Sequence, residues 1–223
     1  MQDEWRGETI MSARPKRDRR RNRPERRESR REAERSPSTP GEPAAPSSQR
    51  GGQISVRRVP GEEAWELVYP PSVLRRQEDM EEVRAMLAAG EIDVAVDELR
   101  WLLSGCRALL EAQKLLGEVA LADNDLPLAR AHLGYAYEMG LAAIQGEKDF
   151  TGPLPYALAA NRPFFEAGKG LAWCLQQQGD ARSAVDVIRQ LLELDPSDPL
   201  GLKALLKKHQ EGLHDSGSAP NEL

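Results

Sequence analysis

The sequence predicts an all-α body, a solenoid of short helical hairpins, preceded by a disordered basic N-terminal arm. Three observations predict it. Apolar residues recur at helical spacing in residues 61–213, three similar turns interrupt that pattern, and residues 1–60 hold few large apolar side chains. Hairpins this short cannot bury their apolar faces alone, so we expect copies that stack on one another.

The arm differs from the body in charge. Residues 1–60 carry 16 Lys and Arg against 9 Asp and Glu, whereas the remainder carries 15 against 27. Such a segment buries too little apolar surface to offset its ordering entropy, so we expect disorder, with residues 36–52 as a Pro/Ser/Gly-rich linker. Met11 offers an alternative start.

From Arg14 to Arg35 the arm has eleven Arg and one Lys, with acids among them and no aromatic residue. Arginine attracts phosphate through counterion release, but the acids dilute that field and no ring is present to stack on bases. We expect weak, non-specific contact with polyanions; the alternative is a selected RNA or DNA contact. The contacting residues would be Arg19, Arg20, Arg21, Arg26 and Arg27.

The body begins near Ala64. Residues 65–69 are mostly apolar and precede Pro70 and Pro71, and proline disfavours helix in the residue before it. We therefore expect an extended segment that caps the first helices, with Trp65 packed in the core.

Three turns share one pattern: a residue that tolerates the left-handed conformation, then an acid, then an alanine four residues later. They are Gly90-Glu91 with Ala95, Asn124-Asp125 with Ala129, and Gly179-Asp180 with Ala184. The first two alanines lie 34 residues apart, and the third follows after 55, one such period plus 21. The turns predict hairpins over residues 76–109, 110–143 and 165–198.

This 34-residue helix-turn-helix pattern resembles the tetratricopeptide repeat. The family's small first-helix residue is met by Gly117 and Ala172, but Val83 takes its place in the first copy. The closing proline is present only as Pro196. The resemblance implies that the first helices of the copies line a concave groove that accepts an extended peptide or a helix.

Carried onto this chain, the family's groove positions fall on 13 residues: Gln77, Met80, Arg84, Leu87, Glu111, Lys114, Glu118, Leu121, Glu166, Lys169, Trp173, Gln176 and Gln177. Seven of them are the candidate binding residues: Arg84, Lys114, Glu118, Glu166, Lys169, Trp173 and Gln177. Trp173 is the expected anchor because aromatic residues dominate interface energetics; the alternative is that it is buried by the insertion. The family's clamp for C-terminal carboxylates is absent, because its Lys and Asn positions hold other residues: Met80, Arg84, Leu115, Glu166 and Gly170.

Residues 144–162 form an insertion between the second and third hairpins. Its glycines and prolines exclude one continuous helix, and its apolar residues predict that it packs down, as a structural flap or as a partial lid on the groove. Asp198 and Pro199 begin a predicted capping helix, residues 199–211, that covers the last repeat. Residues 214–223 are predicted to be a disordered tail.

No residue set predicts catalysis. The three histidines, His132, His209 and His214, are dispersed, and no cluster has metal-ligand spacing. Gly168-Lys169-Gly170 lacks the spacing of a phosphate-binding loop. We therefore expect neither enzymatic activity nor a cofactor or metal.

Localisation and function follow from the same residues. Cys106 and Cys174 are expected to be free, buried thiols, which fits a reducing compartment. No apolar run approaches the roughly 20 residues that span a bilayer, and the N-terminus lacks a signal-peptide core, so we expect a cytoplasmic protein.

The predicted function is a protein–protein interaction module, an adaptor, scaffold or assembly factor; the alternative is an RNA-associated protein that uses the arm.

Overall fold

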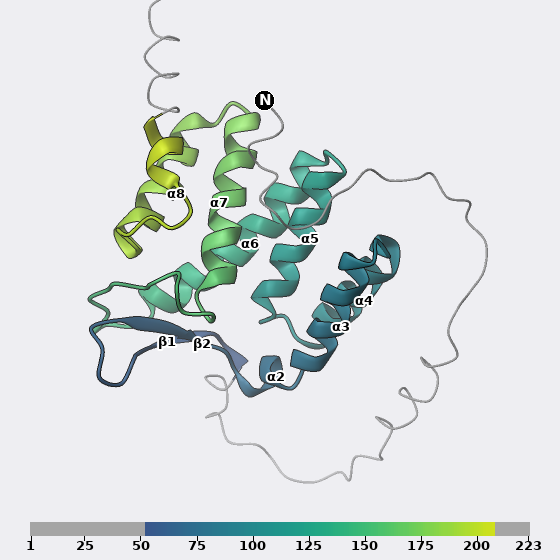
Figure 1. Ribbon diagram of the computed structural model, residues 1–223, viewed down its shortest axis with the longest axis horizontal. Coiled ribbons are helices and arrows are strands. Elements are labelled where there is room, and N and C mark those ends of the chain that lie inside the picture. Colours follow the sequence, from purple (N-terminus) through teal and green to yellow (C-terminus); the bar gives the residue numbers. More distant parts are fainter. Residues whose placement is uncertain (1–51, 208–223) are drawn as a thin grey trace, which may run out of the picture. The chain divides into compact units, whose positions relative to one another are not determined.

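Helices make up most of residues 52–207, the part of the chain that the computed structural model describes (Figure 1). The predictions for the Arg-rich run, residues 36–51 of the linker and the C-terminal tail concern residues outside this range. Six helices form three consecutive hairpins: α3 (Gln77–Ala88) with α4 (Ile92–Gly105), α5 (Leu110–Ala122) with α6 (Leu126–Gln145), and α7 (Arg162–Gln177) with α8 (Ala181–Leu194). The prediction of a mainly helical body is confirmed.

The turns within the hairpins have the expected left-handed residues. The φ angle is 76° at Gly90, 59° at Asn124 and 81° at Gly179. Asp125 and Asp180 then cap the following helices, because each side chain accepts a hydrogen bond from a backbone N–H three residues on. Glu91 makes no such bond at the start of α4.

Small residues let the helices approach closely. Ala95, Ala129 and Ala184 are all fully buried, as their place after each turn predicts. At Gly117, an added Cβ would lie 2.5 Å from Cγ of Leu133 on the partner helix. Consecutive helices from α3 to α8 pack on one another, and α5 also packs on α7. In Figure 1 the hairpins accordingly follow one another across the body.

A short antiparallel sheet precedes the helices. Strands β1 (Ser55–Arg58) and β2 (Trp65–Val68) pair in register, with Ser55 opposite Val68. β1 lies in the segment assigned above to the disordered arm, so that boundary at residue 60 is wrong. Val56 and Leu67 are buried on one face of the pair, which gives the strands a core to pack on.

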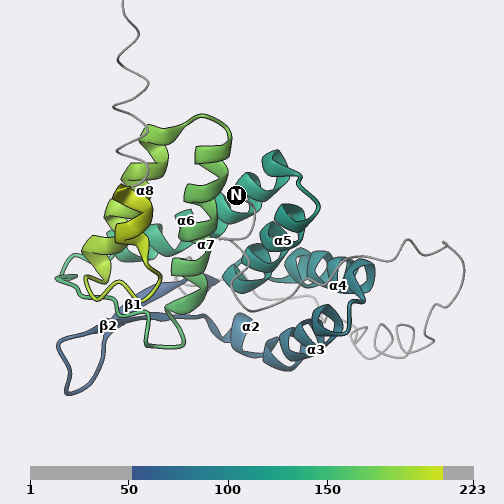
Figure 2. The ribbon, with the colours of Figure 1, turned by 45° about the horizontal axis from the view of Figure 1, so that its top comes forward.

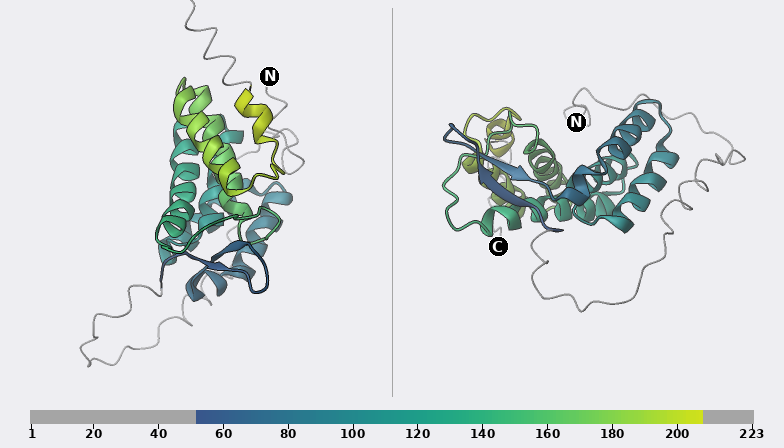
Figure 3. Two further views of the ribbon diagram at one scale, coloured as in Figure 1. Left: turned by 90° about the vertical axis from the view of Figure 1, so that its left-hand side faces the viewer. Right: turned by 90° about the horizontal axis from the view of Figure 1, so that it is seen from below.

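The β-hairpin lies at one end of the helices (Figures 2 and 3). Its expected neighbours were the first helices, but its hydrogen bonds lead to the insertion: the N–H of Trp65 donates to the Pro153 carbonyl (2.9 Å). Trp65 is 7% exposed, in agreement with its predicted packing role. A one-turn helix, α2 (Pro71–Leu74), leads from the sheet into α3.

The insertion packs down, as predicted, and Asn161 holds it. This side chain is fully buried. Its Oδ1 accepts from the Leu67 N–H (2.8 Å), and its Nδ2 donates to the carbonyls of Trp65 (3.1 Å) and Pro155 (2.9 Å). Leu154, also fully buried, donates its N–H to the carbonyl of Leu194 at the end of α8 (2.8 Å).

The predicted capping helix begins later than expected, at residue 202 instead of 199. The chain first turns through left-handed residues Asp198 (φ 55°) and Gly201 (φ 68°). The Asp198 carboxylate then accepts from the N–H groups of Leu202 and Lys203, and Leu202 is buried. The helix continues to residue 207, where the described part of the chain ends.

Candidate functional site

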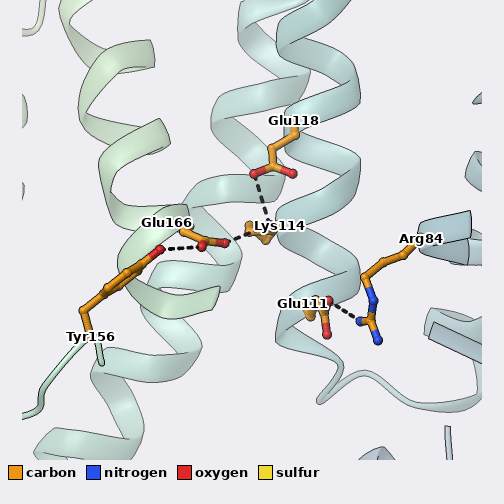
Figure 4. Close-up of polar contacts among 6 residues, drawn as sticks. All are labelled: Arg84, Glu111, Lys114, Glu118, Tyr156 and Glu166. Atoms are coloured by element: carbon orange, nitrogen blue, oxygen red, sulfur yellow. Dashed lines mark hydrogen bonds and ion pairs between the residues drawn. The ribbon is translucent and has the colours of Figure 1, made fainter. Parts of the chain in front are cut away.

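A line of ion pairs crosses α3, α5 and α7 (Figure 4). Arg84 on α3 contacts Glu111 on α5 (2.6 Å), and Lys114 on α5 contacts both Glu118 (3.1 Å) and Glu166 on α7 (2.9 Å). We call these five residues the charge ladder. It brings together four of the seven candidate binding residues. The fifth member, Glu111, lies at another of the groove positions that the repeat pattern predicts, one turn before Lys114 on the same helix face.

Lys114 is the centre of the ladder, with only 12% of its side chain exposed. Burial acts to lower the pKa of Lys114, but attraction and hydrogen bonds from Glu118 and Glu166 outweigh it and raise that pKa. Burial raises the pKa of Glu118; Lys114 opposes this shift, and repulsion from Glu166 and Glu111 adds to it. Lys114 therefore stays charged and already has partners, which is unlike a free catalytic base.

The insertion reaches the ladder through Tyr156. Its hydroxyl donates to Oε1 of Glu166 (2.9 Å), while Lys114 binds the other carboxylate oxygen. The Arg162 guanidinium lies over the Tyr156 ring, 5.8 Å from its centroid. Burial, and then the charge of Glu166, raise the pKa of Tyr156, so its hydroxyl remains a donor at neutral pH. Glu166 is thus held from two sides.

A small apolar hollow adjoins the ladder at Arg84 and Glu111. We call it the N-terminal hollow; its volume is about 170 Å³. Its lining comes from the segment around α2, from α3, from the start of α5, from the insertion and from the first turn of α7: Tyr69, Val73, Leu74, Gln77, Met80, Arg84, Leu109, Leu110, Glu111, Ala159 and Pro163. Leu74 is 58% exposed at its rim. The Tyr69 hydroxyl donates to the Ala160 carbonyl (2.9 Å), which fixes one wall.

This hollow is smaller than the roughly 300–1,000 Å³ of typical small-molecule sites. It has room for one large side chain, with charged groups beside it. Four of its lining residues, Gln77, Met80, Arg84 and Glu111, lie at predicted groove positions. Leu74 was not predicted, because it lies in a single helical turn where no periodic pattern can form.

A second hollow lies between α6, α7 and α8. This α6–α8 hollow is broad and open, with a volume of about 600 Å³. It includes Tyr135, which is 45% exposed, together with Leu171 and Val187. None of the predicted groove residues lines it.

The other three candidate binding residues lie apart from both hollows. Lys169 donates from Nζ to the carbonyl of Leu200 (3.3 Å), so the segment after α8 covers its ammonium group. Trp173 is half-buried and Gln177 is exposed. None of the three lines either hollow.

Chemistry-bearing groups elsewhere are dispersed or buried. Between residues 52 and 207, no group of three or more His, Cys, Asp or Glu could hold a metal ion. Cys106 and Cys174 are free and buried, as expected, and burial raises the pKa of Cys174 to about 11. Within the same residues no helix is long and apolar enough to cross a membrane.

No protein-family model matches the sequence, and no curated protein matches it. The features that bear on function are therefore the charge ladder, the N-terminal hollow and the fold that positions them.

Proposed function

We propose that this protein is a non-enzymatic interaction module of the cytoplasm, an adaptor, scaffold or assembly factor. It binds a peptide or a helix of a partner protein across α3, α5 and α7. The observation that carries this proposal is the N-terminal hollow, an apolar space that opens directly beside the charge ladder. Such a combination, one apolar anchor site flanked by charges, is typical of peptide recognition.

We further propose that the three hairpins are divergent tetratricopeptide-type repeats in a solenoid. The left-handed turn residues, the buried alanines after them and the packing of α5 on α7 support this assignment. In such an array the first helices line the binding face, and α3, α5 and α7 are the first helices here.

The hollow and the ladder would have different roles in binding. An anchor side chain that fills the N-terminal hollow would bury the exposed surface of Leu74 and supply most of the affinity. The ladder would select among peptides, because a wrongly placed charge next to a fixed ion pair is repelled.

A random peptide library displayed on phage tests the proposal, with the full-length chain as bait. Selected peptides should bind the wild-type chain and lose at least tenfold in affinity for Leu74→Glu, which puts a charge at the mouth of the hollow. Tyr135→Glu is the matched control, because it places the same charge in the α6–α8 hollow. It should leave the affinity unchanged.

Trp173→Ala belongs in the same experiment, because the sequence places the anchor there. Loss of binding in Trp173→Ala alone would move the site to α7. Loss in Tyr135→Glu alone, or no selected peptide at all, would overturn the proposed function.

A second candidate function is nucleic-acid association, which the eleven Arg of residues 14–35 favour. Replacing Arg19, Arg20, Arg21, Arg26 and Arg27 by Gln in the full chain should then weaken binding to generic single-stranded RNA. A plot of the logarithm of the RNA-binding constant against the logarithm of salt concentration should also become less steep, by about 0.7 per lost phosphate contact. Unchanged RNA binding would exclude this function for the five arginines.

A further inference from the structure

The charges of the binding face are unequal. Helices α3, α5 and α7 carry seven Asp and Glu against four Lys and Arg. All four cations are engaged: Arg84 and Lys114 by ladder glutamates, Arg162 by the Tyr156 ring and the Ala157 carbonyl, and Lys169 by the Leu200 carbonyl.

The surplus acids lie on α3. Glu78, Glu81 and Glu82 are exposed, and within residues 52–207 none of them makes an ion pair. Glu81 follows Gln77 by four residues and precedes Arg84 by three, so all three lie on neighbouring parts of one helix surface. Gln77 and Arg84 both line the N-terminal hollow, which places Glu81 at its edge.

Resting on the proposed function, we infer that the partner segment is cationic: one large apolar side chain enters the N-terminal hollow, and Lys or Arg residues beside it pair with Glu81 and its acidic neighbours on α3. An acidic segment would instead meet these glutamates unscreened. The cations of the face could not compensate, because they already have partners. Charge complementarity of this kind sets specificity and association rate.

Nuclear magnetic resonance titration of the full-length chain provides the test. The probe is a synthetic dodecapeptide with one Trp and four Lys among Gly and Ser. Two matched peptides replace the four Lys by Glu, or the Trp by Ser. The Lys peptide should shift the amide signals of Val73, Gln77 and Met80, and each matched peptide should bind about tenfold more weakly.

Variants then locate the two contacts. Glu81→Arg should weaken the Lys peptide about three- to tenfold at low salt, and the loss should shrink as salt shortens the Debye length. Glu193→Arg on α8 is the matched control; it makes the same change in net charge at an exposed site and should have less than a twofold effect. Leu74→Ser should weaken binding, whereas Leu128→Ser, at a leucine of similar exposure (42%), should not.

Equal binding of the Lys and Glu peptides, or equal effects of Glu81→Arg and Glu193→Arg, would overturn the inference. Shifts confined to the α6–α8 hollow would also overturn it. If library peptides bind at Leu74 but show no preference for Lys or Arg, this inference fails and the proposed function stands. If no library peptide binds there, both fail.

Discussion

Gly140 on α6 lies directly against the Phe164 ring of α7, and replacing it with alanine tests how the second and third hairpins pack. A Cβ built at Gly140 would lie only 2.9 Å from Cγ of Phe164, inside normal contact distance. That ring atom is bonded to the Phe164 Cβ, so the ring cannot swing away without changing its rotamer. Phe164 is fully buried, stacked on Tyr137 with centroids 5.3 Å apart and edge-on to Phe165. The added methyl group therefore has no space.

The magnitude follows from two opposing terms. Overpacking of a core costs about 1–3 kcal/mol, while replacing Gly by Ala inside a helix gains about 1 kcal/mol. Gly134→Ala, on the same helix, supplies the control: its nearest neighbour would be Cδ1 of Leu171 at 3.6 Å, an ordinary contact. It should show only the helix gain. The two variants should therefore differ by about 1–3 kcal/mol, or about 2–12 °C in Tm for a chain of this size.

Thermal unfolding followed by far-ultraviolet circular dichroism measures the difference. Gly134→Ala should melt at or above the wild-type temperature and Gly140→Ala below that of Gly134→Ala. If Gly140→Ala is as stable as Gly134→Ala, then α6 and α7 do not pack as described.

Three further predictions concern single side chains. Asn161→Ala leaves two carbonyls and one N–H without their buried partner and should destabilise the protein by about 2–4 kcal/mol in urea unfolding; an effect below about 1 kcal/mol would contradict its bridging role. The folded-state pKa of Glu118 lies above its ordinary value of 4.5. Protonated Glu118 therefore adds to the free energy of unfolding below pH 4.5, and this contribution is lost as the pH rises through the raised pKa. Glu118→Gln should remove this loss, so the stability of the variant relative to wild type should rise as the pH increases above 4.5, whereas a constant difference would refute the shift. Cys106 and Cys174 should react with a disulfide reagent only after denaturation, and fast reaction of either thiol in the native protein would show that the core opens there.

The sequence pattern predicted the helical hairpins well, because each turn is determined by a few adjacent residues. The left-handed conformations at Gly90, Asn124 and Gly179 occur at the positions that the turn chemistry predicts. β1 was missed because its stability is not local. Ser55–Arg58 has a single buried residue, Val56, and its pairing with β2 depends on neighbours far along the chain.

The candidate site was predicted in part for a similar reason. Arg84, Lys114, Glu118 and Glu166 come together because helix periodicity, together with the order of the hairpins, determines their faces. The cover over Lys169 depends on an irregular turn after α8, which periodicity does not describe. The N-terminal hollow has walls from five separate segments, and no single stretch of sequence contains that information.

Asn161 also has a consequence for the order in which the protein is made. Its bond to Leu67 joins residues 94 positions apart. At a synthesis rate of about 5–20 residues per second, roughly 5–20 s pass between the emergence of β2 from the ribosome and that of its support. The two strands are therefore among the first described elements to be synthesised and among the last to gain their core contacts. A chaperone that acts on the nascent chain would therefore meet this β-hairpin before its cover has been made.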